Sequence, residues 1–334
     1  MNNKDTEELP EITVPLDMKY YFYGLSDEFI SSLNTIFNPN LGYLSRYIDI
    51  SNLEAITFTC EDYYEDAINS IDRGFPITNR ITPSKDGAAM TLPLKRDNNI
   101  KCHIVFNINK WTSNLNENEN EYNLLTNHTL SIIAHEMGHV EIMNNLHKYK
   151  PNICFPQSFN SLKEAKGFEI PKLSIEEFGA CKKTYIIDID DQNISLKDFE
   201  SLLIQHLNEI NGNQMIFINE FKNELNNNIN YYDACCNYAE KSYKNYGRLL
   251  ILSSYYLGLK DNSIECHINI KDHELFKYIK ELLILLNKAY KNYPSWQDSD
   301  FSDIKNLLEV ILIEEAKIDF RTDPFGMDYF TVNL

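Results

Sequence analysis

The stretch LSIIAHEMGHV, Leu130–Val140, decides how the rest of the chain is interpreted. It contains the motif HExxH: His135 and His139 are four residues apart, and Glu136 directly follows the first histidine. On a helix, residues four apart lie one turn apart on the same face, so both imidazoles can bind one Zn²⁺ ion. Glu136 lies at the margin of that face, where it can act as a general base without being a ligand. The motif therefore predicts a zinc site on a helix.

The residues around the motif favour one long helix. Leu130, Ile133, Met137 and Val140 recur every three to four residues, and the pattern continues to about residues 147–149. Gly138 lies inside this pattern, although a glycine within a helix costs roughly 1 kcal/mol relative to alanine. We therefore expect another part of the chain to pack closely against it.

A catalytic zinc site usually has three protein ligands and one open position, so a third ligand must come from elsewhere. The extended motif HExxHxxGxxH is absent, because Ile142 and Asn145 replace its glycine and last histidine. The best candidate is Glu177, with Glu176 as the alternative. The run Ser174-x-x-Glu177 is also a capping box, which would make Glu177 a structural residue at the start of a helix.

The rest of the chain divides into a mixed half and a helical half, which predicts the α+β class. Strands are expected at Ala55–Cys60, at His103–Asn109 and, as an edge strand, at Thr91-Leu92 before Pro93. Beyond Ser195, apolar residues at helical spacing predict helices at about 196–210, 214–227, 231–258, 272–292 and 302–317. We place the boundary so that residues 1–192 form the catalytic domain and residues 193–334 form a helical region packing on it.

These motifs resemble the zincin metallopeptidases of the gluzincin type, in which a glutamate on a following helix completes HExxH. The ImmA/IrrE-type peptidases have a strand, HExGH and a helix with ExxA. Lethal-factor-type toxin proteases have a later Glu-Phe-x-Ala, which is similar to Glu177–Ala180 here. In clostridial-neurotoxin-type light chains the ligand is the second glutamate of a Ser-x-Glu-Glu run, which is similar to Ser174–Glu177. All three patterns map the third ligand onto Glu177. Cys181 stands where the first group usually has Asn.

The resemblance implies a zincin-like domain, with a small mixed sheet and an active-site helix, and a zinc-dependent endopeptidase activity. His135, His139 and Glu177 would bind Zn²⁺, and Glu136 would be the general base for a metal-activated water that attacks a peptide bond of a protein or peptide substrate. The oxyanion needs a further electrophile; the candidates are Tyr185, His147, Arg321 and Tyr329. In zincins an edge strand binds the extended substrate, and His103–Asn109 and the Thr91 segment compete for that role.

Two alternatives belong to other functional classes. The first is a zinc-bound but non-proteolytic sensor or binding module that uses the helical half to bind a partner. The second is a helical interaction protein with an accidental HExxH. Replacement of Glu136 distinguishes these hypotheses, because only an enzyme would lose activity while it retains zinc.

Charge and composition exclude several other classes. With 31 basic and 49 acidic residues the net charge is 31 − 49 = −18, which argues against nucleic acids and anionic membranes as partners. No apolar run approaches the roughly 20 residues of a membrane span. The polar N-terminus MNNKDTEELPE is unlike a signal peptide, and the seven cysteines include no CxxC pair. We therefore expect a cytoplasmic protein with reduced thiols, with export by a signal-independent route left open and the oligomeric state undetermined.

Overall fold

The computed structural model describes residues 9–76, 81, 87–112, 127–185, 193–260, 268–322, 324 and 328–334. The chain forms two compact units. The first comprises Met1–Pro156 and Gly179–Ile194, and the second comprises Gln157–Phe178 and Ser195–Leu334. The segment 157–178, which the sequence analysis assigned to the N-terminal domain, thus clusters with the C-terminal helices.

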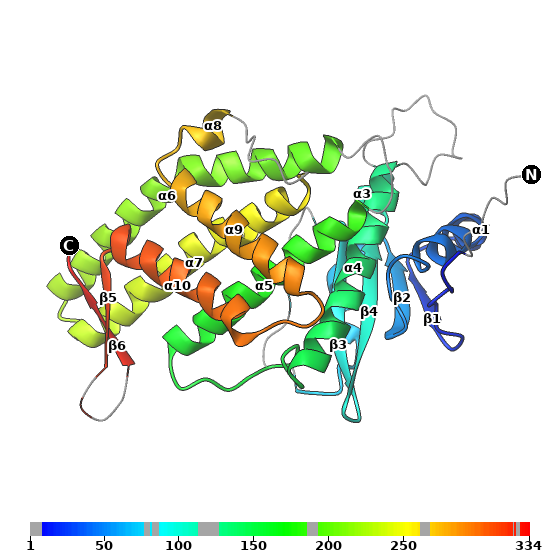
Figure 1. The fold of residues 1–334 in the computed structure, drawn as a ribbon, viewed down its shortest axis with the longest axis horizontal. Coiled ribbons are helices and arrows are strands. Elements are labelled where there is room, and N and C mark those ends of the chain that lie inside the picture. The colour runs from blue at the N-terminus through cyan, green and yellow to red at the C-terminus, as the bar shows by residue number, and fades with distance from the viewer. Residues whose placement is uncertain are drawn as a thin grey trace, which may run out of the picture. The chain divides into compact units, whose positions relative to one another are not determined.

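The first unit is built on a four-stranded mixed sheet in the order β1-β2-β4-β3 (Figure 1). β1, β2 and β4 run parallel, and β3 is antiparallel to β4 at the edge. The strands are β1 (Lys19–Tyr23), β2 (Leu53–Thr59), β3 (Ala89–Arg96) and β4 (Asn99–Asn107), and the helices of this unit are α1 (Asp27–Leu44), α2 (Glu61–Ser70), α3 (Asn109–Thr112) and α4 (Asn127–Tyr149). Because β1 and β2 are parallel, the chain must cross over between them, and α1 makes that crossover.

The two faces of the sheet carry different helices. Successive strand residues point to opposite faces. On β3, Leu92 joins the apolar cluster of α2, while Thr91 next to it contacts Glu136 of α4. α4 therefore covers the face opposite to α2, where it packs along β3 and β4 (Figure 1). This packing holds the HExxH helix against the edge strand of the sheet.

The helix α5 (Leu162–Thr184) belongs to both units: its residues up to Phe178 cluster with the second unit and those from Gly179 with the first. Its N-terminal part packs inside the second unit, where Phe178 meets Tyr290 edge to face and Lys163 lies 3.8 Å from Glu309. Its C-terminal turns pack on α4 inside the first unit. A single helix thus continues from one unit into the other.

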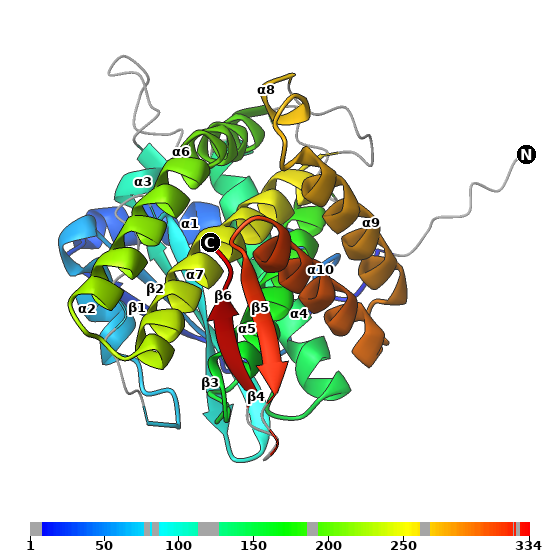
Figure 2. The same ribbon diagram turned by 90° about the vertical axis from the view of Figure 1, so that its left-hand side faces the viewer.

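In its described residues the second unit consists of helices, their connecting turns and one hairpin. Its elements are α6 (Asn193–Asn226), α7 (Tyr231–Gly258), α8 (Ile268–Lys271), α9 (Phe276–Asn292), α10 (Asp298–Glu314), β5 (Ile318–Thr322) and β6 (Asp328–Val332). α7 is the central helix and contacts α9, α10 and β6 (Figure 2). Gly247 of α7 allows close packing, because a Cβ there would lie 2.5 Å from Ile170 of α5. The core of this unit therefore lies around α7.

The sequence predictions agree with this fold in its main parts. The chain is mixed α+β with a small mixed sheet and a helical C-terminal half. The two helices expected between residues 196 and 227 are one helix, α6, and the β5–β6 hairpin was not expected. No helix in the described ranges combines the length and the apolar character that a membrane crossing requires.

Candidate metal centre

α4 places the two motif histidines on one face, as the spacing predicts. The Nε2 atoms of His135 and His139 lie 3.1 Å apart, with the rings perpendicular and their centroids 4.7 Å from each other. Two ligands bound at about 2.0–2.1 Å to one ion can be no more than about 4.2 Å apart, so this separation suits a shared ion. The helix alone therefore supplies two convergent nitrogen ligands.

Glu177 joins this pair from α5. One ligand atom each from His135, His139 and Glu177 lie within 4.8 Å of one another. Glu177 precedes Gly179 by half a turn of the same helix, so the turns of α5 that pack on α4 also fix its position. The structure thus brings together the three residues that the sequence analysis chose as ligands.

The capping-box interpretation of Glu177 was wrong. α5 begins at Leu162, so Ser174 lies in the middle of the helix, and Pro171 also lies within it. Interior residues have no orphan backbone N–H groups at a helix start to cap. The alternative ligand, Glu176, is only 2% exposed and pairs with Lys172 at 3.2 Å, one turn earlier. Glu176 is not part of the three-residue cluster.

Close packing between α4 and α5 explains the glycine inside the motif. A Cβ at Gly138 would lie 3.0 Å from Ala180 Cα and 3.2 Å from Ala180 O, both backbone atoms that cannot rotate away. A Cβ at Gly179 would lie 2.7 Å from Ile142 Cδ1, which is the end of a side chain and not backbone, so this contact constrains the helix spacing less. At Gly138 the two helices therefore pack so closely that an alanine would require the backbone of α5 to shift by a few tenths of an ångström, in agreement with the close packing that the sequence predicted.

A buried ion pair fixes the register of the two helices. Lys183 Nζ of α5 donates to Glu141 Oε1 of α4 at 2.6 Å, and both side chains are 10% exposed. The other oxygen, Glu141 Oε2, accepts the backbone N–H of Asp49 at 2.9 Å. Because buried charges are costly without partners, this arrangement opposes sliding of α5 along α4.

His135 has a neighbour behind its ligating atom. Cys181 Sγ lies 3.6 Å from His135 Nδ1, and the Cys181 side chain is fully buried. A group that bonds the far nitrogen of a metal-binding histidine fixes the ring orientation and the tautomer. Cys181, which stands where the ImmA/IrrE-type pattern usually has Asn, therefore contacts the first histidine of the motif.

Glu136 is held by the edge strand. The Thr91 hydroxyl of β3 donates to Glu136 Oε2 at 2.6 Å and lies 3.2 Å from Glu136 O. Both residues are buried, with Glu136 6% exposed. The sequence predicted an edge strand at Thr91 but gave no sign of this contact, because 45 residues separate the partners.

The sheet order also decides between the two candidate substrate strands. β4, which contains His103–Asn107, lies between β2 and β3, so both its edges are occupied. The expectation that His103–Asn109 offers a free edge was wrong. β3 is the edge strand, and among the described strands it pairs only with β4. The Thr91 segment therefore remains as the candidate edge for an extended peptide.

Two of the four oxyanion candidates, His147 and Tyr185, lie some distance along the chain from the ligands on α4 and α5. His147 lies about 12 Å along α4 from His139 at 1.5 Å per residue, and its Nε2 is 3.2 Å from Asn98 O. Tyr185 follows the last turn of α5, about the same distance beyond Glu177. Arg321 and Tyr329 are cross-strand partners in the β5–β6 hairpin of the second unit.

The donor set suits a transition-metal ion such as zinc better than Mg²⁺ or Ca²⁺. Two imidazoles and one carboxylate form the ligand set of zinc hydrolases that keep a position for water, whereas Mg²⁺ and Ca²⁺ prefer oxygen ligands alone. The neighbouring Cys181, Thr91 and Lys183–Glu141 contacts provide the supporting shell that such sites need. No family model, curated protein or solved structure matches the chain. The site therefore rests on its own geometry.

Proposed function

We propose that the protein is a zinc-dependent endopeptidase. The observation that carries this proposal is the cluster of His135, His139 and Glu177, whose ligand atoms lie within 4.8 Å of one another beside Glu136. A structural zinc site would use four protein ligands, often cysteines, and would need no acid next to it. Three ligands with an adjacent buried carboxylate suit metal-assisted hydrolysis of an amide.

When bound, the metal supplies a Lewis acid that polarises the scissile carbonyl and acidifies a water molecule. Glu136 takes the proton from the attacking water and passes it to the leaving amine nitrogen. Its hydrogen bond from Thr91 holds Oε2 in place, so the carboxylate does not need to reorient for the transfer. His135 is held from behind by Cys181, and α5 keeps Glu177 at the site through its packing on α4.

The substrate class follows from the edge strand. An extended peptide can add to β3 through backbone hydrogen bonds, a mode that recognises main chain more than particular side chains. Thr91 on that strand would then couple substrate binding to the position of Glu136. The six described cysteines are all free thiols, which supports a reducing compartment such as the cytoplasm as the place of action.

Replacement of Glu136 by glutamine tests the activity. The purified chain is loaded with Zn²⁺ and incubated with a mixture of denatured proteins, and new N-termini are identified by mass spectrometry. The wild type should cleave and a chelator should stop it. Glu136→Gln should retain its zinc but lose at least about 100-fold in rate, because a general base contributes 10²–10⁴-fold.

Two results would contradict the proposal. Cleavage by Glu136→Gln at the wild-type rate would exclude Glu136 as the base. Zinc-loaded wild type that generates no new N-termini would favour the non-proteolytic sensor.

A further inference from the structure

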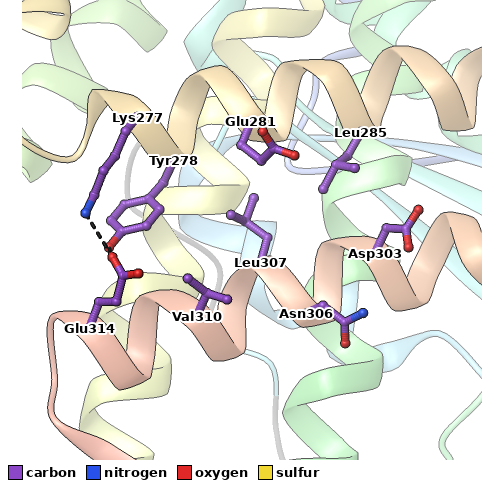
Figure 3. A pocket seen from close by; sticks show the side chains of 9 residues that line it. All are labelled: Lys277, Tyr278, Glu281, Leu285, Asp303, Asn306, Leu307, Val310 and Glu314. Carbon is purple, nitrogen blue, oxygen red and sulfur yellow. Dashed lines mark hydrogen bonds and ion pairs between the residues drawn. The ribbon is translucent and has the colours of Figure 1, made fainter.

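A groove on the second unit runs between the antiparallel helices α9 and α10, with a volume of about 570 Å³ (Figure 3). Its floor is apolar: Leu285 from α9 faces Leu307 and Val310 from α10. Val310 is 42% exposed, and Ile313, one turn further along α10, is 48% exposed. Apolar side chains that line an open groove favour a binding surface over an ordinary solvated face.

An ion pair between the two helices lies at each end of the groove. Lys277 lies 2.9 Å from Glu314, and Lys288 lies 2.7 Å from Asp303. At 1.5 Å per residue, residues 277 and 288 are about 16 Å apart along α9, a length that corresponds to about three turns of a helix. The bounded stretch thus suits a docked helix of about that length.

The middle of the groove holds a carboxylate with no cation opposite it. Glu281 lies between the two ion pairs, and no described residue forms an ion pair with it (Figure 3). Asn306 lines the groove from α10 and adds an amide that can accept or donate a hydrogen bond. The lysines at both ends of the groove already pair with carboxylates. A cation from a bound partner would therefore pair with Glu281 at the centre.

We propose that the groove between α9 and α10 binds a basic amphipathic helix of a protein partner. Apolar side chains at positions i, i+3 or i+4 and i+7 of that helix contact Leu285, Leu307 and Val310. A lysine or arginine between them faces Glu281. The further assignment of this partner as the substrate that the peptidase cleaves rests on the proposed function.

Charge argues against two other occupants. A second copy of the chain would bring the same carboxylates to a symmetric contact between two molecules of charge −18. An anionic lipid surface would also be repelled by Glu281 and by the net charge of the chain. A basic segment is attracted by both the groove and the whole chain.

A binding assay on the full chain tests this proposal without a known partner. The protein carries Glu136→Gln so that it cannot cleave the probe. The probe is a fluorescent amphipathic peptide of about 15 residues with Leu in a helical stripe and Lys or Arg beside it, and two control probes have the basic residues replaced by Glu or the same composition scrambled. Fluorescence anisotropy gives the affinities.

Two charge reversals of equal size separate groove binding from general attraction. Glu281→Lys should lower the affinity for the basic helical peptide about tenfold or more. Glu240→Lys, on the exposed face of α7, changes the net charge equally and should leave the affinity within about twofold. Val310→Asn should also weaken binding, because it removes part of the apolar floor.

Several outcomes would overturn the proposal: no binding of the basic helical peptide, equal effects of Glu281→Lys and Glu240→Lys, or equal binding of the scrambled peptide. Self-association of the chain that Glu281→Lys abolishes, measured by analytical ultracentrifugation, would assign the groove to a second copy instead. The zinc content of the same samples reports separately on the proposed metal centre. Failure of the groove proposal is therefore distinguishable from failure of the proposed peptidase function.

Discussion

The buried pair between Lys183 and Glu141 should be a principal determinant of how α5 sits on α4. We consider Glu141→Leu, Lys183→Met and the double variant. The charged atoms are 2.6 Å apart and both side chains are 10% exposed. Removal of one partner from such a pair typically costs about 3–5 kcal/mol, because the other charge stays buried without its counter-ion. Glu141→Leu should be the worse of the two, since it also removes the acceptor for the Asp49 N–H.

The double variant should recover part of this loss. With both charges replaced by apolar side chains of similar size, no buried ion remains to be compensated. We expect the double variant to be at least about 1.5 kcal/mol more stable than the sum of the single effects predicts. The same variants should weaken zinc binding, because α5 carries Glu177.

The two tryptophans provide a unit-specific assay. The chain has two, Trp111 in the first unit and Trp296 in the second, and both are buried. In a Trp296→Phe background, urea unfolding followed by fluorescence reports on the first unit through Trp111, and a Trp111→Phe background reports on the second. Additive single effects, with a coupling below about 0.5 kcal/mol, would refute the reasoning. A cost of under about 1 kcal/mol for Glu141→Leu would refute it as well.

Three further predictions address the catalytic base, the helix contact and the sheet. Thr91→Val should lower kcat about 10- to 100-fold with little change in KM, because the Glu136 carboxylate loses the hydrogen bond from the Thr91 hydroxyl. Thr91→Ser keeps a hydroxyl and should restore kcat. Equal kinetics for the two variants would contradict this prediction. Gly138→Ala should weaken zinc binding about tenfold in chelator competition, since its Cβ would press on Ala180, and an unchanged affinity would exclude that contact. Burial lowers the pKa of His103 to about 4, so between about pH 6.5 and 4 the unfolded chain binds a proton that the folded chain does not. The free energy of unfolding should therefore fall by up to about 3 kcal/mol as the pH falls through that window. An NMR titration of His103 with a midpoint near pH 6.5 would contradict this prediction.

Local patterns in the sequence predicted what depends on local geometry. The HExxH spacing and the apolar period around it lie within one helix, so α4, its two convergent histidines and the tight contact at Gly138 could be expected. The start of α5 could not be predicted in this way, because the motif Ser174-x-x-Glu177 is compatible both with a helix start and with a helix interior. Only the tertiary packing of the helix decides between the two.

The supporting contacts lay beyond any sequence pattern. Thr91 and Glu136 are 45 residues apart, and Glu141 and Lys183 are 42 apart. Their pairing depends on how β3 and α5 pack on α4, which no local period encodes. The central position of β4 is likewise a property of strand order, and this is why the expectation of a free edge at His103–Asn109 was wrong.

The most direct test of the account is the zinc content of three matched proteins: the wild type, Glu177→Gln and Glu176→Gln, purified without metal-binding tags and measured by elemental mass spectrometry. The two variants remove the same charge from adjacent residues of one helix. We predict about one zinc per chain in the wild type and in Glu176→Gln, whose carboxylate pairs with Lys172, and much less in Glu177→Gln. Full zinc in Glu177→Gln, or none in the wild type after zinc is supplied, would contradict the account.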